Sequence, residues 1–317
     1  MQIIGSIRVS VIGVGHMGKL HAEKLSKMPD VNFMGVYDID AGRAKEIAVL
    51  CNTRAFDTFE EAMRSAHAII LATPTETHTK MGVNIIKNNK HLFIEKPISS
   101  YEDEAEILLS LASERNLVLM VGHIENFNPA FIVARTFIKD PLFVESHRLT
   151  SFRGRGADVS VIEDLMVHDI ELLVSICGAE IKSLDASAAS VITNYPDIAN
   201  VRIRFASGCV ANLTASRLSL SSKRKMRLFQ KDAYISIDFE NRIVEIASPV
   251  GERPEGQIVA MGDFRVEICR PEVAQTDALE QEISTFLRAI RGEFIVSAEP
   301  ALEAMLIVKR IVEALRK

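Results

Sequence analysis

Cysteine is scarce in this sequence, and its spacing excludes two common kinds of site. The four cysteines are Cys51, Cys177, Cys209 and Cys269, and no two of them form a C-x-x-C pair. Structural zinc sites and redox-active dithiols are both recognised by such close spacing, so neither is predicted and no metal centre is expected. Scattered cysteines are typical of proteins that work in a reducing compartment.

Long apolar runs and an excess of positive charge are also lacking. No run approaches the roughly 20 apolar residues that a membrane-spanning helix needs, and the residues around Arg8 leave no room for the apolar core of a signal peptide. A formal net charge of −5 and an isoelectric point near 6.0 argue against a nucleic-acid-binding surface. We therefore expect a cytoplasmic protein whose partners include neither a membrane nor a nucleic acid.

The sequence does contain a change of pattern part-way along its 317 residues, a length that allows two domains. In the first part, short apolar strands alternate with helical segments, which is typical of βαβ units and a parallel sheet. The predicted strands are 7–12, 32–37, 68–72, 91–94 and 117–121, and the predicted helices are 19–27, 41–50, 58–65, 77–88 and 102–115. We predict an α/β fold whose residues 1–122 form a Rossmann domain with a doubly wound parallel sheet.

Residues 123–317 combine a few helices with many strands of alternating polarity, which indicates an α+β domain with a large open, mostly antiparallel sheet. Ser207-Gly208 and Glu240-Asn241 are predicted hairpin turns, and 251–262 is a predicted loop. The last two helices can pack back on the first domain. The predicted strands are 143–152, 181–191, 200–205, 209–216, 225–229, 233–239, 243–248 and 264–269, and the predicted helices are 128–138, 159–176, 278–290 and 301–315.

A G-x-G-x-x-G motif, Gly13, Gly15 and Gly18, follows the first predicted strand and precedes the first helix. In that context the first glycine permits a tight turn, the second lets the backbone approach a pyrophosphate, and the third lets the helix pack on the strand. Unpaired N–H groups at the helix N-terminus attract the phosphate charge. The motif predicts a dinucleotide site, to which His16 and Met17 also belong; the alternative is a glycine turn without a nucleotide.

Asp38 stands 20 residues after Gly18, at the end of the second predicted strand. A carboxylate there accepts hydrogen bonds from the adenosine ribose and repels a 2′-phosphate, so NAD is favoured over NADP. Asp40 adds a second carboxylate. Arg43 argues the other way, but we expect it on the following helix. The alternative for Asp38 is a solvent-exposed carboxylate at a strand end.

The ends of the third and fourth predicted strands carry further polar residues. Open α/β sheets bind ligands there, so Thr73, Pro74, His78 and Glu95 are predicted to contact the cofactor. Lys96 follows in the Glu95-Lys96-Pro97 turn, where partial burial would disfavour its ammonium form and fit it for proton transfer. A surface Lys-Pro turn is the alternative for Lys96, and capping of the next helix is the alternative for the threonines near His78.

Asp164 and His168 are four residues apart on a predicted helix, so they are expected to share one face. Histidine exchanges protons near neutral pH, and a carboxylate can orient its ring. The alternative is a surface Asp–His pair. Asp169 adds an ambiguity, since it could point elsewhere or pair with the sheet. Before this helix, Arg153 and Arg155 could hold a diphosphate by bidentate contacts or could belong to a solvated loop. A basic strand face at Lys223, Lys225 and Arg227 is interpreted as solvated rather than phosphate-binding.

Four of these motifs stand in the order found in the Gfo/Idh/MocA oxidoreductases, and the chain resembles that family over nearly its whole length. The motifs are GVGHMG with Asp38, TPTETH, Glu95-Lys96-Pro97, and Asp164 with His168. The resemblance implies a nucleotide-binding domain followed by an α/β domain whose open sheet forms homodimers or homotetramers. It also implies oxidation or reduction of a sugar, an inositol or a nucleotide sugar, with Lys96 as acid/base and His168 as its partner.

The segment 122–129, GHIENFNP, resembles the GHIERFNP of a branch that oxidises the C3 hydroxyl of UDP-N-acetylglucosamine. That branch makes a 3-keto sugar for a pathway aminotransferase, on the way to the 3-amino sugar of lipid A. Asn126 departs from the arginine of the branch. The alternatives are another sugar or inositol dehydrogenase of the family and a non-catalytic dinucleotide-binding sensor. Predicted substrate contacts are Lys96, Glu125, Asn128, Arg153, Arg155, Asp164 and His168.

Overall fold

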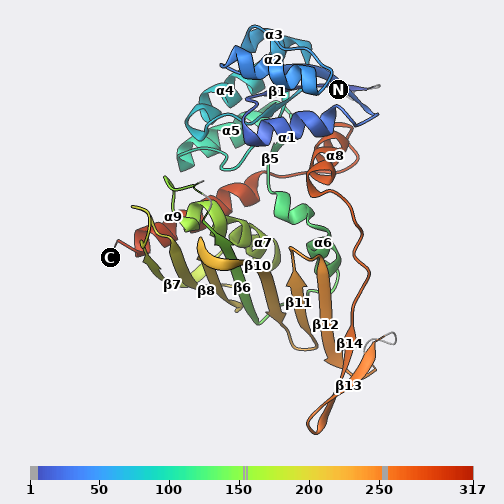
Figure 1. Cartoon of the computed structure of the whole chain (residues 1–317), viewed down its shortest axis with the longest axis vertical. Helices are drawn as coiled ribbons and strands as arrows, with labels where there is room; N and C mark the ends of the chain where they lie inside the picture. The colour runs from blue at the N-terminus through green and yellow to red at the C-terminus, as the bar shows by residue number, and fades with distance from the viewer. Residues whose placement is uncertain (1–5, 153, 155, 252–255, 317) are drawn as a thin grey trace. The chain divides into compact units, whose positions relative to one another are not determined.

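The computed structural model describes residues 6–152, 154, 156–251 and 256–316, which form two compact units (Figure 1). The first unit comprises Met1–Ile124 and Ala278–Leu302, and the second comprises Glu125–Asp277 and Glu303–Lys317. Each unit has its own sheet, and each is described by itself below. Among the described residues, no helix has both the length and the apolar character to cross a membrane.

The first unit is built on a five-stranded, fully parallel sheet in the order β2-β1-β3-β4-β5. The strands are β1 (Ile7–Ile12), β2 (Val31–Tyr37), β3 (Ala68–Leu71), β4 (His91–Ile94) and β5 (Leu119–Val121). The helices are α1 (His16–Leu25), α2 (Ala41–Leu50), α3 (Phe59–Ser65), α4 (Thr75–Lys87), α5 (Glu102–Glu114) and α8 (Ala278–Ile290). The predicted Rossmann sheet is confirmed.

Burial explains why this sheet is parallel and central. All four residues of β3 are inaccessible to solvent, and so are Ile7, Val9, Val11 and Ile12 of β1. Strands covered on both faces carry continuous apolar runs, as these do. The chain leaves β1 for β2 on one side and later returns to place β3 on the other. The strand order therefore reverses at β1, and this is where an open sheet forms a ligand crevice.

The second unit contains a nine-stranded sheet in the order β13-β14-β12-β11-β10-β6-β9-β8-β7. Every neighbouring pair is antiparallel except β6 and β9, which are parallel. The strands are β6 (Phe143–Ser151), β7 (Ile181–Ala189), β8 (Ile198–Phe205), β9 (Val210–Ser216), β10 (Leu218–Phe229), β11 (Tyr234–Asp238), β12 (Ile243–Pro249), β13 (Gln257–Met261) and β14 (Phe264–Cys269). The predicted α+β domain with a large, mostly antiparallel sheet is confirmed.

Helices accompany this sheet along one face. They are α6 (Pro129–Arg135), α7 (Val167–Cys177) and α9 (Glu299–Ala314), with a 3₁₀ turn, η1 (Ile124–Phe127), and a π turn, η2 (Ile162–Met166). In β8, exposed and buried residues alternate strictly, so Val201, Ile203 and Phe205 reach the core while their neighbours face outward. Together with buried residues of α6, α7 and α9 they form one hydrophobic cluster.

Most predicted boundaries agree with the structure within two or three residues. At the start of α3, Thr58 is the N-cap, and its side chain accepts from the Glu61 N–H. Three expectations are wrong. The predicted loop 251–262 contains β13, a short alternating segment that pairs with β14; residues 252–255 lie outside the described residues. The predicted helix 159–176 begins with the π turn. Strand β10 starts at Leu218 rather than at 225, and its pairing with β6 is irregular between Leu218 and Lys223.

Candidate active site

A cleft of about 610 Å³ lies in the first unit at the carboxyl ends of β1 to β4. The chain turns into a helix or a loop at each of these strand ends, so side chains and open backbone groups meet there. Of the predicted cofactor contacts, those that line the cleft are Gly13, Gly15, Met17, Asp38, Thr73, Pro74, Glu95 and Lys96. The lining also includes residues that the sequence did not point to, namely Tyr37, Ile39, Ala72, Thr77 and Met81, and the Arg43 that it placed elsewhere.

The glycine motif has the geometry that its spacing predicts. Gly13 has φ +81°, and a Cβ there would lie 2.7 Å from the Ala72 carbonyl oxygen. A Cβ on Gly18 would overlap the Gly13 carbonyl, so this glycine lets α1 pack against the turn. Gly15 is the N-cap of α1 and faces open space, with no atom within 4 Å of a Cβ placed on it. No side chain caps α1, so its first N–H groups can donate hydrogen bonds to a phosphate.

Asp38 lies at the β2 end of the cleft and is only 8% exposed. Its Oδ2 accepts the Val14 N–H at 2.8 Å and its Oδ1 accepts the Asp40 N–H at 2.9 Å. These bonds fix the carboxylate, and each oxygen keeps a second lone pair for a ribose hydroxyl. Arg43 is on α2 as expected, yet its Nη1 reaches to 3.7 Å from Asp38 Oδ2.

His78 and His16 are placed differently from the other predicted contacts. His78 is buried behind the cleft, with Nδ1 2.9 Å from the Pro97 carbonyl oxygen and Nε2 2.8 Å from that of Thr73. Burial lowers its pKa, although the backbone contacts oppose this. His78 therefore joins two strand ends rather than lining the cleft, and exposed His16 is also absent from the lining.

Capping by a threonine at the start of α4 was the alternative for this region, and it is wrong. The N-cap is Pro74, which makes no side-chain cap. The Thr77 hydroxyl instead donates to the Pro74 carbonyl at 2.7 Å, within the first turn of the helix.

Pro97 follows Lys96 through a cis peptide bond.

Glu95 is held by a residue that sequence reasoning missed. Its Oε1 lies 2.6 Å from Nε2 of His21, a wholly buried residue of α1. Burial tends to raise the pKa of Glu95, but the hydrogen bond with His21 and the adjacent Lys96 bring that pKa below its usual range. The wall of the cleft beside Lys96 is therefore an ionised carboxylate with a fixed direction.

In the second unit, His168 is the second residue of α7, and its Nδ1 lies 3.5 Å from Oε2 of Glu171. The Glu171 side chain is 3% exposed, against 17% for His168. Asp164 is in the π turn, so the α-helical spacing assumed for Asp164 and His168 does not apply. Asp164 lines a pocket of about 410 Å³ together with Gly156 and Arg217. The i,i+3 spacing of His168 and Glu171 was the signal available in the sequence.

Glu125, a predicted substrate contact, is buried in an ion triad. Arg148 of β6, itself 3% exposed, donates to Glu125 Oε1 at 2.7 Å. It also binds Asp169 through both carboxylate oxygens, at 3.1 Å and 3.0 Å. Of the two possibilities left open for Asp169, the structure shows pairing with the sheet. The charge of Arg148 outweighs the effect of burial and lowers the pKa of Glu125.

Asn128 caps α6, because its Oδ1 accepts the Ala130 N–H at 3.0 Å, and its amide donates to the Phe239 carbonyl at 3.3 Å. Asn126 Oδ1 is buried and has no hydrogen-bond partner in the described part of the chain. Substrate contact by Glu125 and Asn128 stays a prediction. Arg153 and Arg155 lie outside the described residues.

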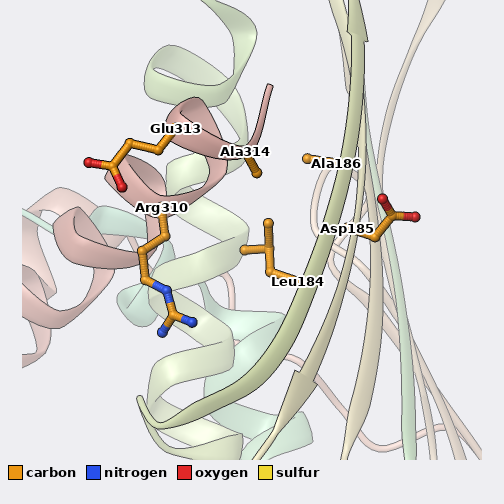
Figure 2. Close-up of a pocket in the computed structure, with 6 residues that line it drawn as sticks. All are labelled: Leu184, Asp185, Ala186, Arg310, Glu313 and Ala314. Carbon is orange, nitrogen blue, oxygen red and sulfur yellow. The ribbon is translucent and has the colours of Figure 1, made fainter. Parts of the chain in front are cut away.

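Two residues of the basic strand face are paired with acids: Lys225 Nζ is 2.9 Å from Asp238, and Arg227 is 3.5 Å from Glu145. Another hollow of about 410 Å³ lies between β7 and α9 (Figure 2). Figure 2 shows the Arg310 and Glu313 side chains pointing apart, and none of the predicted site residues is among those lining this hollow.

Within the described ranges, no cluster of His, Cys, Asp or Glu could hold a metal ion.

Two family models match the chain. An oxidoreductase-family model with an NAD-binding Rossmann fold covers residues 7–123, and the GFO/IDH/MocA C-terminal domain covers residues 140–236. The chain belongs to the GFO/IDH/MocA oxidoreductase family. It is therefore an oxidoreductase, and residues 7–123 match an NAD-binding Rossmann domain.

Individual relatives place the chain among dehydrogenases that act on hydroxyl groups. It is 36% identical to UDP-N-acetylglucosamine 3-dehydrogenase of Acidithiobacillus ferrooxidans, over 97% of this chain and 98% of that protein. It is 27% identical to inositol 2-dehydrogenase of Rhizobium meliloti, over 95% and 94%. A solved structure of UDP-N-acetylglucosamine 3-dehydrogenase from A. ferrooxidans matches with a TM-score of 0.89 and 33% identity, over 99% of this chain and 98% of that one.

Proposed function

We propose that this oxidoreductase uses NAD to oxidise the C3 hydroxyl of UDP-N-acetylglucosamine to the 3-keto nucleotide sugar. The observation that carries the proposal is Lys96 on the wall of the dinucleotide cleft, in a chain 36% identical over nearly its full length to a UDP-N-acetylglucosamine 3-dehydrogenase. Residues 1–122 are assigned to cofactor binding. Residues 123–317 are assigned to substrate binding and to assembly of a homodimer or homotetramer.

NAD is favoured over NADP by the fixed carboxylate of Asp38. A ribose with free hydroxyls can donate to its oxygens, whereas a 2′-phosphate would meet a buried negative charge. The open backbone at Gly15 and the uncapped start of α1 suit the pyrophosphate. When bound, NAD supplies the acceptor for the hydride that leaves C3 of the sugar.

The chain's own residues supply orientation and proton transfer. The amine of Lys96 or the ring of His168 takes the proton of the C3 hydroxyl as the carbonyl forms, so the substrate loses one hydride and one proton. A carboxylate then fixes the imidazole of His168. The sequence assigned this role to Asp164, and the contact with Glu171 supports a second candidate.

The test is incubation of the purified protein with NAD and UDP-N-acetylglucosamine, followed by mass spectrometry for a product lighter by two hydrogens. Formation of the ketone can be uphill, so an aminotransferase and an amino donor are included to remove it. Such an enzyme would be the pathway partner, on the way to a 3-amino sugar for lipid A. The matched control is Lys96→Met, which should form the product at least about a hundredfold more slowly.

A second candidate, oxidation of an inositol or a free sugar, is favoured by the relationship to inositol 2-dehydrogenase. A panel of free sugars, inositols and UDP-sugars, followed by NADH absorbance, separates the two. Turnover of a free polyol without turnover of any UDP-sugar would overturn our choice of substrate. Tight NAD binding without turnover of any compound would indicate a sensor instead.

A further inference from the structure

His21 and Glu95 form a buried pair at the floor of the dinucleotide cleft. Nε2 of His21 is 2.6 Å from Oε1 of Glu95, although the two residues are 74 positions apart. The His21 side chain is fully buried, and that of Glu95 is 11% exposed on the side where it lines the cleft. His21 therefore touches the wall of the site from behind and is itself out of reach of a ligand.

The surroundings of His21 define which nitrogen carries the proton. The ring lies edge-on to Phe93, with 5.1 Å between ring centroids, and Phe93 in turn packs on Phe286. Nδ1 is buried and has no hydrogen-bond partner among the residues described. A proton on Nδ1 would leave a buried donor unpaired, whereas a proton on Nε2 is shared with a carboxylate. The geometry therefore selects the tautomer that donates from Nε2 to Glu95.

The second oxygen of Glu95 is confined as well. A Cβ placed on Gly122 would lie 3.1 Å from Oε2, so the backbone at the end of β5 packs closely against the carboxylate. Oε1 is bonded to His21 and Oε2 lies against Gly122, so the carboxylate is held in place where it lines the cleft.

The strand ends along the cleft follow the order of a dinucleotide's parts. Asp38 is at the end of β2, where the adenosine ribose binds, and the glycine turn after β1 takes the pyrophosphate. Glu95 follows β4, two strands beyond β1 in the sheet order. Glu95 is thus at the nicotinamide half of the cleft. A fixed carboxylate there is suited to the hydroxyls of the second ribose, because a diol offers two donors to it.

We infer that His21 is a positioning residue that holds the Glu95 carboxylate toward the ribose of the nicotinamide half. The inference rests on the proposed dinucleotide site and adds a residue that does not touch the ligand. It depends on the Nε2 donor alone, because Nδ1 has no hydrogen-bond partner among the described residues. A side chain that donates a hydrogen bond from the position of Nε2 should still hold the Glu95 carboxylate. A side chain that donates from the position of Nδ1 should not.

Glutamine and asparagine make a matched pair for the test, since the amide nitrogen of Gln reaches about as far as Nε2 of histidine and that of Asn about as far as Nδ1. Calorimetry measures the affinity of the full-length wild type, His21→Gln and His21→Asn for NADH and for ADP. ADP carries only the adenosine half. We expect His21→Asn to weaken NADH binding roughly tenfold with ADP binding unchanged, and His21→Gln to stay within about threefold of wild type.

Glu95→Gln provides the second half of a double-mutant cycle. Because His21 acts through the carboxylate, His21→Asn should weaken NADH binding much less in the Glu95→Gln background than in the wild type. This readout separates positioning from a general loss of structure, which would add to the effect of Glu95→Gln instead. The thermal midpoint of each variant without ligand is measured alongside.

The outcomes are distinct. A wild type that binds neither NADH nor NAD overturns the proposed cofactor site itself. If the wild type binds and His21→Asn binds NADH equally well, the positioning role is overturned while the function stands. Equal loss of NADH and ADP affinity, or additive effects in the cycle, also overturns it. Should His21→Asn fail to fold, Glu95→Gln decides: unchanged NADH affinity relative to ADP would show that the carboxylate, and hence its support, has no part in binding.

Discussion

Arg43 Nη1 lies 3.7 Å from Asp38 Oδ2, so the residue that favours NAD and the residue that would favour NADP are in contact. Asp38 is nearly buried, whereas the Arg43 side chain is 48% exposed and can move. Replacing Asp38 with serine removes the negative charge and releases the guanidinium. We expect Asp38→Ser to shift the ratio of NADP to NAD affinity at least about tenfold toward NADP, because arginine binds phosphate in a bidentate manner.

Arg43→Ala is the matched control for this change. In the Asp38→Ser background it should remove the gained NADP affinity and leave NAD binding nearly unchanged, as measured by calorimetry with both cofactors. Asp38→Ser with an unaltered ratio of the two affinities would contradict the role assigned to Asp38.

Lys96→Met tests proton transfer separately from cofactor binding. Methionine keeps the length of the side chain but cannot take a proton. We expect kcat to fall by about 10²–10⁴, while the Kd for NADH changes by less than about threefold. Steady-state kinetics measures kcat, and calorimetry measures the Kd for NADH. Near-normal turnover of this variant would leave His168 as the candidate base.

Glu171 and Asp164 are rival orienters of His168, and two isosteric variants separate them. The carboxylate of Glu171 is 3.5 Å from Nδ1, so Glu171→Gln should lower kcat by about tenfold with little change in KM. Asp164→Asn should lower kcat much less if Asp164 serves only the neighbouring pocket. A kcat for Glu171→Asp close to that of the wild type would support the view that a negative charge orients the His168 ring. A larger loss of kcat in Asp164→Asn than in Glu171→Gln would assign the orientation of His168 to Asp164.

The Arg148 triad should dominate the stability of the second unit. Arg148→Met leaves two buried carboxylates without their cation, and we expect a loss of about 3–5 kcal/mol in the free energy of unfolding. Arg227→Met breaks the half-exposed pair with Glu145 and should cost at most about 1 kcal/mol. Urea unfolding of both variants measures the free energy of unfolding. Equal losses in the two variants would contradict the greater importance of the buried triad.

His91 makes the first unit sensitive to mild acid. Its Nδ1 accepts the Val118 N–H at 3.0 Å, and burial, with the nearby charge of His67, lowers its pKa from 6.5 to about 4. As the pH falls through 6.5, the unfolded chain takes up a proton that the folded chain does not, so stability is complete above that pH and is lost down to about pH 4.

Asparagine at this position can accept the same N–H and does not titrate. We therefore expect the urea midpoint of the wild type to fall more than that of His91→Asn between about pH 7.5 and about pH 5. The other titratable groups are the same in both proteins, so their effects cancel. An equal fall of the urea midpoint in the two proteins would contradict the role of His91 in acid sensitivity.

The sequence predicted those parts of the site whose signal is local. Gly13, Asp38 and Lys96 each follow a short apolar strand, and parallel strands bring their carboxyl ends to one edge, so a common cleft follows from the order of the elements. The alternation of buried and exposed residues in β8 made the second sheet predictable in the same way.

Contacts between distant residues were out of reach. His21 and Glu95 are 74 residues apart, and Arg148 is 23 residues from Glu125 and 21 from Asp169, with no pattern in the sequence that links them. Glu125 therefore looked like a polar residue available to substrate, although it satisfies a buried arginine. His78 looked available for the same reason, because its two carbonyl partners are visible only in the fold.

The π turn at Ile162–Met166 has a consequence for comparing this chain with other members of its family. Its wider turn, in which the Val167 N–H bonds to the Ile162 carbonyl, accommodates one more residue than an α-helix would. A relative with a regular helix here would be one residue shorter, and counting across the gap would rotate every assignment by about 100°. Superposition of backbones, rather than residue counting, is the safe way to transfer roles across this segment.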